Sequence, residues 1–238
     1  MSEYVKNLVL IPGLNNTKQI WDEVIEHLPS SIECYPITVP AIANLDQLAE
    51  EVLKDLPDQF HLAGFSFGGF LALAMLEKAP ERITGLSLIG TSAEGESDAS
   101  RELRKKSIAR AESGEYEEMV AAGVNRTFFP SNVEDKKFQK IRKQMLTDYG
   151  QDRYVAHATA TMARVDRHHL LEKHDIPYLF VASVNDVVVP LEKTKQMTNY
   201  AKNAQFATVD RSGHLIPLEQ PKELAELMEP WLGKNNHS

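Results

Sequence analysis

Short apolar runs alternate with helical patterns at both ends of this chain, and this alternation restricts the fold more than any other feature. The runs NLVLI, IECYPI, FHLAGF and ITGLSLIG are separated by helical patterns such as TKQIWDEVIEHL and LDQLAEEVLKDL. Strands that alternate with helices are typical of a parallel sheet with crossover helices. Near-continuous apolar character suits strands that are covered on both faces. The sequence therefore predicts an α/β fold with a mostly parallel central sheet and helices on both of its faces.

The alternation stops between Gly95 and Leu170 and resumes with PYLFVAS, LEKTKQMTNYA, AQFATVD and PKELAELMEPWL. In the interrupted stretch, apolar residues recur at a helical spacing, at Val133, Phe138, Ile141 and Met145. This stretch holds 14 Lys and Arg against 12 Asp and Glu, whereas the rest of the chain holds 12 against 22. We predict a core formed by residues 1–94 and 171–238, with residues 95–170 as an inserted helical cap.

Composition excludes several classes of protein. A chain of 238 residues, 42% of them hydrophobic, can bury one sizeable core. The net charge of -8 argues against a nucleic-acid partner and leaves small neutral or apolar molecules open. Cys34 is the only cysteine, so neither an internal disulfide nor a cysteine-based metal cluster is expected. No leader-like segment and no run long enough to span a membrane is visible, so we expect a soluble cytoplasmic protein.

The sequence GFSFGG at residues 64–69 lies between an apolar run and a helical pattern. Gly-x-Ser-x-Gly in this context is typical of a nucleophile elbow, where small neighbours allow a tight, strained turn at the serine. The pattern predicts Ser66 as a nucleophile and the N–H of Phe67 as a hydrogen-bond donor to an oxyanion. The alternative is a strand-to-helix turn that requires glycine for its backbone alone.

A serine nucleophile needs a base and a carboxylate that orients the base, and two later loops supply them. Asp186 follows PYLFVAS, and His214 follows AQFATV. The order Ser, Asp, His is the one found with nucleophile elbows, and the carboxyl ends of parallel strands meet at one edge of a sheet. Taken alone, Asp186 is also a candidate N-cap for a helix that begins near Pro190, and His214 a candidate surface histidine.

The other seven histidines lack a glycine neighbour on a loop after a strand, and we expect them to be ordinary surface or loop residues. They are His27, His61, His157, His168, His169, His174 and His237. The adjacent pair His168 and His169 lacks the i, i+4 spacing of a helical zinc site, so the sequence does not favour metal-dependent hydrolysis.

A second oxyanion donor is expected on the loop after the first strand, in LVLIPGLNNTKQIW. Pro12 and Gly13 turn the chain there, which makes the backbone N–H of Leu14 the candidate. Because the donor is a backbone group, the side chains on this loop matter little to it.

Large side chains near the serine and in the insertion are candidates for an apolar substrate pocket. They are Phe65 and Phe67 beside the serine, and Phe128, Phe129, Tyr149, Tyr154 and Met162 in the insertion. The alternative for the aromatic residues is ordinary core packing. Arg164 is a candidate for binding a substrate carboxylate, although a salt bridge to Asp166 or a contact that closes the cap would serve equally well.

Taken together, GFSFGG, NDVVVP, SGHLIPLEQP and LIPGL resemble the α/β-hydrolase fold, and the resemblance spans almost the entire chain. Within that superfamily the chain is similar to the small capped carboxylesterase-like serine hydrolases, whose cap-exit segment commonly carries an Arg and an Asp two residues apart. The resemblance implies a catalytic triad of Ser66, Asp186 and His214, an oxyanion hole formed by the amides of Leu14 and Phe67, and no cofactor or metal.

A serine nucleophile favours acyl chemistry, whereas members of this fold that act at saturated carbon use an aspartate. We therefore predict a serine esterase that cleaves a small carboxylic ester through an acyl-enzyme intermediate. The same triad would also suit a lactonase, a C–C hydrolase or a perhydrolase, and a ligand receptor or signalling protein can be built on the same scaffold. The sequence leaves the oligomeric state and the acyl and alcohol preferences open.

Overall fold

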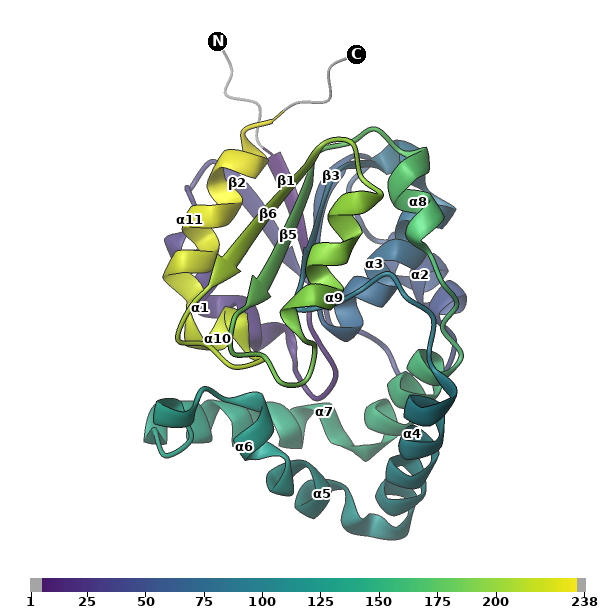
Figure 1. Ribbon diagram of the computed structural model, residues 1–238, viewed down its shortest axis with the longest axis vertical. Coiled ribbons are helices and arrows are strands. Elements are labelled where there is room, and N and C mark those ends of the chain that lie inside the picture. The colour runs from purple at the N-terminus through teal and green to yellow at the C-terminus, as the bar shows by residue number, and fades with distance from the viewer. Residues whose placement is uncertain (1–5, 235–238) are drawn as a thin grey trace.

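A computed structural model describes residues 6–234, and six strands in that range form one parallel sheet (Figure 1). The strands are β1 (Lys6–Ile11), β2 (Ile32–Pro36), β3 (Phe60–Phe65), β4 (Ile83–Ile89), β5 (Tyr178–Ser183) and β6 (Ala204–Val209). Their order across the sheet is β2-β1-β3-β4-β5-β6, and each neighbouring pair is parallel. The predicted fold class is confirmed.

Both faces of the sheet are buried because the central strands carry apolar side chains at most positions on both faces. In β1, Leu8 and Leu10 pack into the cluster that contains Trp21, whereas Val9 and Ile11 pack into the cluster on the opposite face with Leu71. Successive side chains of a strand point to opposite faces, so a continuous apolar run supplies two core layers at once.

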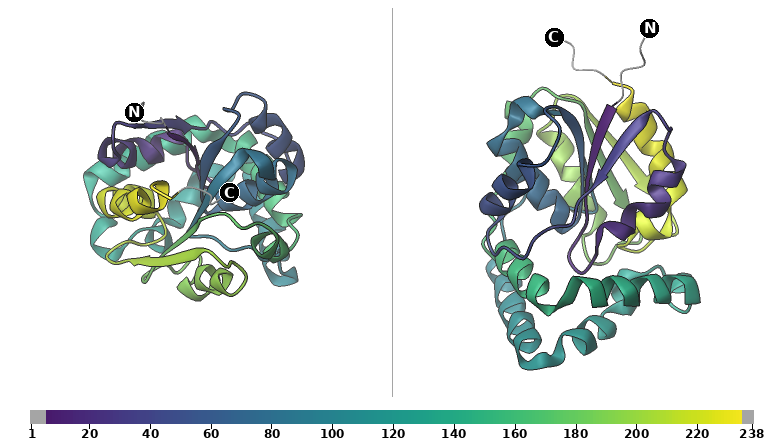
Figure 2. Two further views of the ribbon diagram at one scale, coloured as in Figure 1. Left: turned by 90° about the horizontal axis from the view of Figure 1, so that it is seen from above. Right: turned by 180° about the vertical axis from the view of Figure 1, so that it is seen from behind.

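Helices cover both faces of the sheet, as the view from above shows (Figure 2). On one side lie α1 (Asp22–His27), α10 (Ile216–Glu219) and α11 (Pro221–Leu232), and on the other α2 (Leu45–Leu53), α3 (Phe67–Lys78), α8 (His168–Lys173) and α9 (Leu191–Gln196).

The start of α2 shows how the sequence sets the boundary of a helix. The side chain of Asn44 accepts hydrogen bonds from the N–H groups of Asp46 and Gln47, which satisfies two donors that a helix start leaves free.

A separate helical layer lies across the carboxyl ends of the strands (Figures 1 and 2). It consists of α4 (Asp98–Arg110), α5 (Tyr116–Ala122), α6 (Val124–Thr127) and α7 (Lys136–Met162). The long α7 is broken at Gly150, whose φ of 74° is unsuited to an α-helix. The apolar face predicted from Val133 to Met145 packs onto the same cluster as Trp21.

The sequence assigns residues 168–170 to the insertion, but they form the start of helix α8, which packs on the core. Leu170 and Leu171 are buried in the cluster that covers α3. None of the helices in residues 6–234 combines the length and the apolar character that crossing a bilayer requires.

Short turns of 3₁₀ or π type complete the described chain. They are η1 (Lys18–Trp21), η2 (Pro80–Arg82), η3 (Ala111–Glu115), η4 (Pro130–Asn132) and η5 (Met197–Asn199).

Three histidines that were expected at the surface are buried instead. His61 on β3 is 5% exposed, His157 on α7 has no exposed surface, and His168 is also buried. Tertiary packing decides this burial, since each ring lies against an aromatic neighbour. Burial lowers the pKa of His61 and of His157 to about 4. His237 lies outside the described residues.

These two histidines should make the fold sensitive to mild acid. Below about pH 6.5 the unfolded chain binds protons at both imidazoles, whereas the folded chain stays unprotonated there until about pH 4. Their contribution to stability is therefore present above pH 6.5 and is lost as the pH falls. We expect the free energy of unfolding to drop by about 2 kcal/mol per histidine between pH 7 and pH 5. Urea unfolding followed by circular dichroism at several pH values measures this. His61→Phe, which cannot titrate, should flatten the slope, and an unchanged slope in this variant contradicts the assignment.

Candidate active site

Ser66 occupies the sharp turn between β3 and α3, with φ of 53° and ψ of -116°. The glycines around it are explained by close backbone contacts. A Cβ on Gly64 would lie 2.4 Å from the carbonyl oxygen of Gly68, and a Cβ on Gly68 would lie 2.4 Å from the carbonyl oxygen of Ile11. A larger residue at Gly64 would push the start of α3 away from β3, and one at Gly68 would push it away from the end of β1. The strand-turn-helix context predicted for the elbow is present.

The structure brings the three predicted side chains into one hydrogen-bond chain. His214 Nε2 lies 2.9 Å from Ser66 Oγ, and His214 Nδ1 lies 2.7 Å from Asp186 Oδ2. The residues come from the loops after β3, β5 and β6, which all end at the same edge of the sheet (Figure 1). Asp186 and His214 are buried, whereas Ser66 is partly exposed. An imidazole held between a hydroxyl and a carboxylate can take the hydroxyl proton.

Asp186 is fixed by its own loop and does not cap a helix. Its Oδ1 accepts hydrogen bonds from the N–H groups of Val188 and Val189 at 2.8 and 2.9 Å. Helix α9 begins at Leu191, after Pro190, and has no side-chain cap. The N-cap alternative for Asp186 is therefore wrong, and its second oxygen is free to meet His214.

The loop that carries His214 is attached to the helical layer. The carbonyl oxygen of Thr127, at the end of α6, accepts hydrogen bonds from the N–H groups of His214 and Leu215 at 2.8 and 3.3 Å. A Cβ on Gly213 would lie 2.5 Å from the backbone of Phe128, so the two segments are in close contact. The position of the imidazole thus depends on residues from both parts of the chain.

Glu219 strengthens this connection, and sequence reasoning did not single out this residue. One carboxylate oxygen accepts from the N–H of Phe129 at 2.7 Å and from Asn132 Nδ2 at 2.9 Å. The other accepts from the N–H of Gly213 at 2.8 Å and from Ser212 Oγ at 3.3 Å. Burial raises the pKa of Glu219 although these four donors favour its charged form. The only signal in the sequence is an acidic residue five positions after His214 in SGHLIPLEQ.

A cavity of about 410 Å³ opens beside Ser66, between the core and the helical layer. Leu14 and Phe67, the expected oxyanion donors, both line it together with Ser66 and His214. As the first residue of α3, Phe67 has an N–H without a partner in its own helix. Leu14 lies on the turn after β1, where the N–H of Asn16 bonds to the carbonyl of Gly13.

Five of the six aromatic residues expected at the pocket do not line this cavity, and neither does Met162; Tyr154, one of the five, is buried. Phe65 is fully buried beneath the turn, with its ring 5.1 Å from that of His214. Phe128 is buried against Phe138. Phe129 and Tyr149 also lie outside the lining. The alternative of ordinary packing holds for Phe65 and Phe128 because both point into the core.

Tyr149 belongs to a hydrogen-bond chain that joins the helical layer to the core. Its hydroxyl lies 2.6 Å from Nδ1 of His157, and Nε2 of His157 lies 2.7 Å from the carbonyl oxygen of Pro40. A neutral imidazole accepts from the tyrosine and donates to the carbonyl in this arrangement. The ring of His157 also stacks on Phe67 at 4.7 Å, directly after the serine.

Arg164 does line the cavity, but its ionic partner is Glu96. Its Nη1 lies 2.6 Å from Glu96 Oε2, and its Nε donates to the carbonyl of Glu94 at 3.1 Å. Asp166 bonds instead to His168, so the expected salt bridge between Arg164 and Asp166 is absent from the described residues. Arg164 therefore ties the end of α7 to the segment that leads into α4.

A model of the alpha/beta hydrolase family matches residues 8–227 of the sequence. The chain belongs to this family. The shape agrees with that membership: a thermophilic esterase from Thermogutta terrifontis, solved with malate bound, superposes on this alpha/beta hydrolase with a TM-score of 0.86. The two are 23% identical, and the match covers 96% of this chain and 89% of the esterase.

The chain is also similar to two curated relatives with different names. The chain is 25% identical over 193 residues to the dihydrolipoyllysine-residue acetyltransferase component of an acetoin cleaving system from Pseudomonas putida. That match covers 74% of this alpha/beta hydrolase and only 46% of the relative, so the chain spans about half of that protein's length. It is 20% identical over 249 residues to a pimeloyl-[acyl-carrier protein] methyl ester esterase from Neisseria meningitidis, covering 95% of this chain and 77% of that one.

Replacing Glu219 by glutamine tests the connection between the His214 loop and the helical layer. An amide keeps one acceptor oxygen and turns its NH₂ group toward N–H donors on the other side. We expect Glu219→Gln to lower the free energy of unfolding by about 1 to 3 kcal/mol, as measured by urea unfolding. Glu229→Gln, at an exposed position on α11, is the matched control and should change little. Equal stability of the two variants would show that the four hydrogen bonds do not matter.

Proposed function

We propose that this alpha/beta hydrolase is a serine esterase that cleaves a small carboxylic ester through an acyl-enzyme intermediate. The observation that carries the proposal is the unbroken hydrogen-bond chain from Asp186 through His214 to Ser66 Oγ, with Ser66 in the lining of a cavity. A triad is recognised by such geometry and by the role each group can take.

Each residue has a defined role in the proposed reaction. Ser66 Oγ attacks the ester carbonyl while His214 Nε2 takes its proton, and Asp186 stabilises the imidazolium that forms. The N–H groups of Leu14 and Phe67 bind the oxyanion of the tetrahedral intermediate. His214 then protonates the leaving alcohol, and the acyl group stays on Ser66. Water activated by His214 releases the acid and restores the serine.

The helical layer supports the proposal because it forms one wall of the cavity. We propose that residues 95–170 act as the cap of the enzyme, and that the cap keeps bulk water away from the reacting groups. Thr127, Thr161 and Arg164 contribute to the wall from this segment. Two of the similar proteins are named as esterases, which agrees with ester cleavage.

Substitution of the serine is the direct test. We expect Ser66→Ala to reduce turnover of a chromogenic short-chain acyl ester by a factor on the order of 10⁶, because the nucleophile is lost. A fluorophosphonate probe should label the unmodified protein at Ser66 and leave Ser66→Ala unlabelled, with peptide mass spectrometry locating the adduct. Circular dichroism of the variant controls for folding.

Failure of the folded protein both to cleave esters and to react with the probe contradicts the proposal. Cleavage of lactones or of C–C bonds in place of esters would support the proposed triad but contradict the proposed substrate class. Product analysis of a panel of esters, lactones and vinylogous diketones separates these outcomes.

A further inference from the structure

The cavity beside Ser66 is more highly charged than an apolar ester requires. Its lining includes three cationic side chains, Arg104, Arg164 and Lys193, and two carboxylates, Glu94 and Glu96. Lys193 Nζ lies 2.8 and 2.7 Å from the two oxygens of Glu94, so that pair is complete. The remaining charges are two guanidinium groups and one carboxylate.

Glu96 is shared between the two arginines. Its Oε2 accepts from Arg164 Nη1 at 2.6 Å and from Arg104 Nε at 3.0 Å, and its side chain is only 2% exposed. One buried carboxylate therefore faces two cations, which leaves one positive charge without a counter-ion at this end of the cavity.

The excess charge can be assigned to Arg104. Arg164 is held by Glu96, by the carbonyl of Glu94 and by the ring of Phe70, whose centroid is 4.4 Å from the guanidinium carbon. Arg104 bonds only through Nε, and its Nη1 and Nη2 make no hydrogen bond with any group in residues 6–234. These two nitrogens are the part of a guanidinium that binds a carboxylate in parallel, bidentate fashion.

The position of Arg104 on α4 places its guanidinium at the cavity. Ser100 lies one turn before Arg104 and also lines the cavity, as residues four apart share a helix face. Its hydroxyl adds a hydrogen-bond donor next to the guanidinium. The stretch 95–170, which contains α4, holds 14 basic and 12 acidic residues, whereas the rest of the chain is acidic. Electrostatic repulsion of an anionic substrate is therefore weaker at this stretch than at the rest of the chain.

We propose that the ester substrate carries a second, ionised carboxylate at the far end of its acyl chain, and that Arg104 binds it while Ser66 attacks the ester. This inference rests on the proposed esterase function and names its substrate class. A monoanion matches the single uncompensated charge, whereas a phosphate dianion would leave a negative charge unpaired in the cavity. Arg104 is then a specificity-determining residue, with Glu96 holding its Nε so that the other two nitrogens face the substrate.

A paired substrate series tests the proposal. Monomethyl esters of linear dicarboxylic acids, with four to nine carbons in the diacid, are compared with methyl esters of alkanoic acids of the same length. The ratio of kcat/KM for the charged ester to kcat/KM for the neutral one should be about ten or more at the best length, because a charge-assisted bidentate contact is gained only by the charged ester. Arg104→Met should lower this ratio about tenfold, while Glu96 keeps Arg164 as its partner.

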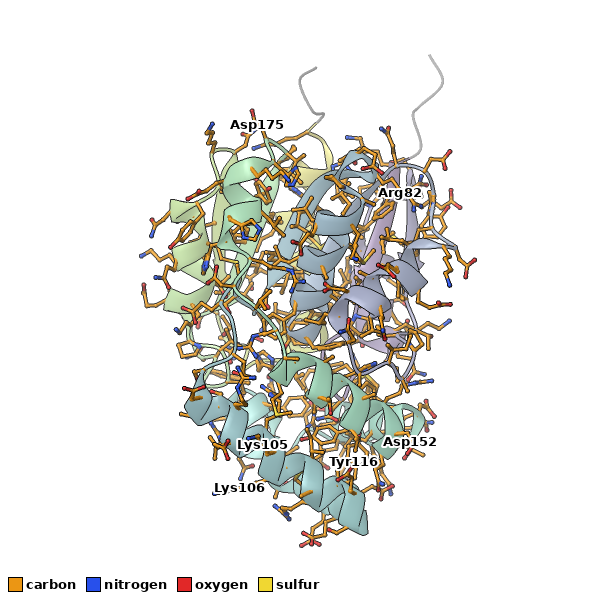
Figure 3. The ribbon with its side chains drawn as sticks, turned by 90° about the vertical axis from the view of Figure 1, so that its right-hand side faces the viewer. Arg82, Lys105, Lys106, Tyr116, Asp152 and Asp175 are labelled. Atoms are coloured by element: carbon orange, nitrogen blue, oxygen red, sulfur yellow. The ribbon has the colours of Figure 1, made fainter. Side chains whose placement is uncertain are left out.

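The control variant is Lys106→Met, which removes one positive charge from the same helix. Lys106 is two residues from Arg104, roughly 200° around the helix, and it points outward at the edge of the molecule (Figure 3). It does not line the cavity. Both the ratio and the activity should stay unchanged in this variant.

Binding gives a readout that does not depend on turnover. Calorimetric titration with the free dicarboxylate of the preferred length should show binding to the Ser66→Ala protein, and about tenfold weaker binding when Arg104→Met is added. A neutral ester cleaved as fast as the charged one at every length, or a ratio that Arg104→Met does not alter, overturns this inference and leaves the esterase function standing. Dicarboxylate binding that is absent or insensitive to Arg104 also overturns it. Loss of the esterase function itself would be seen as inactivity toward both ester series together with an unlabelled Ser66.

Discussion

Close backbone packing at the turn after β3 is the constraint on which the site depends. The left-handed backbone of Ser66 costs about 1 to 3 kcal/mol and persists only where its surroundings hold it. Here the N–H of Ser66 donates to the carbonyl of Ile89 on the next strand, and its own carbonyl accepts from Gly69 N–H and from Thr91 Oγ1, each at 2.9 Å. The turn is thereby held between β1 and β4, and Ser66 lines the cavity.

The base of the proposed triad is positioned differently, by hydrogen bonds that cross from one part of the chain to another. Asp186 is oriented by its own loop, whereas the loop of His214 relies on the carbonyl of Thr127 and on the carboxylate of Glu219. A carboxylate surrounded by four donors is a rigid connector, because each oxygen is satisfied only when both segments are in place. The helical layer thus contributes to the geometry of the site as well as to the wall of the cavity.

The sequence was sufficient for the sheet and for the meeting of Ser66, Asp186 and His214, because both follow from local rules. Apolar alternation predicts strands, and the carboxyl ends of parallel strands must share an edge. The pocket was beyond such rules: Phe128 and Tyr149 have the aromatic side chains expected of an apolar pocket, but the direction of each side chain is decided by packing between α7 and the core. Glu219 was missed for the same reason, since its partners are distant in the chain.

The two hydrogen bonds to the Thr127 carbonyl limit how the helical layer can move relative to the core. Because His214 and Leu215 are attached there, lifting the layer at this point would also displace the imidazole. Helix α4 packs mainly on α7 and on the turn η3, and α5 packs mainly on η3, α4 and α6. The position of the imidazole is therefore tied to the end of α6, so any change in the angle of the helical layer at that point would reach the proton-transfer step.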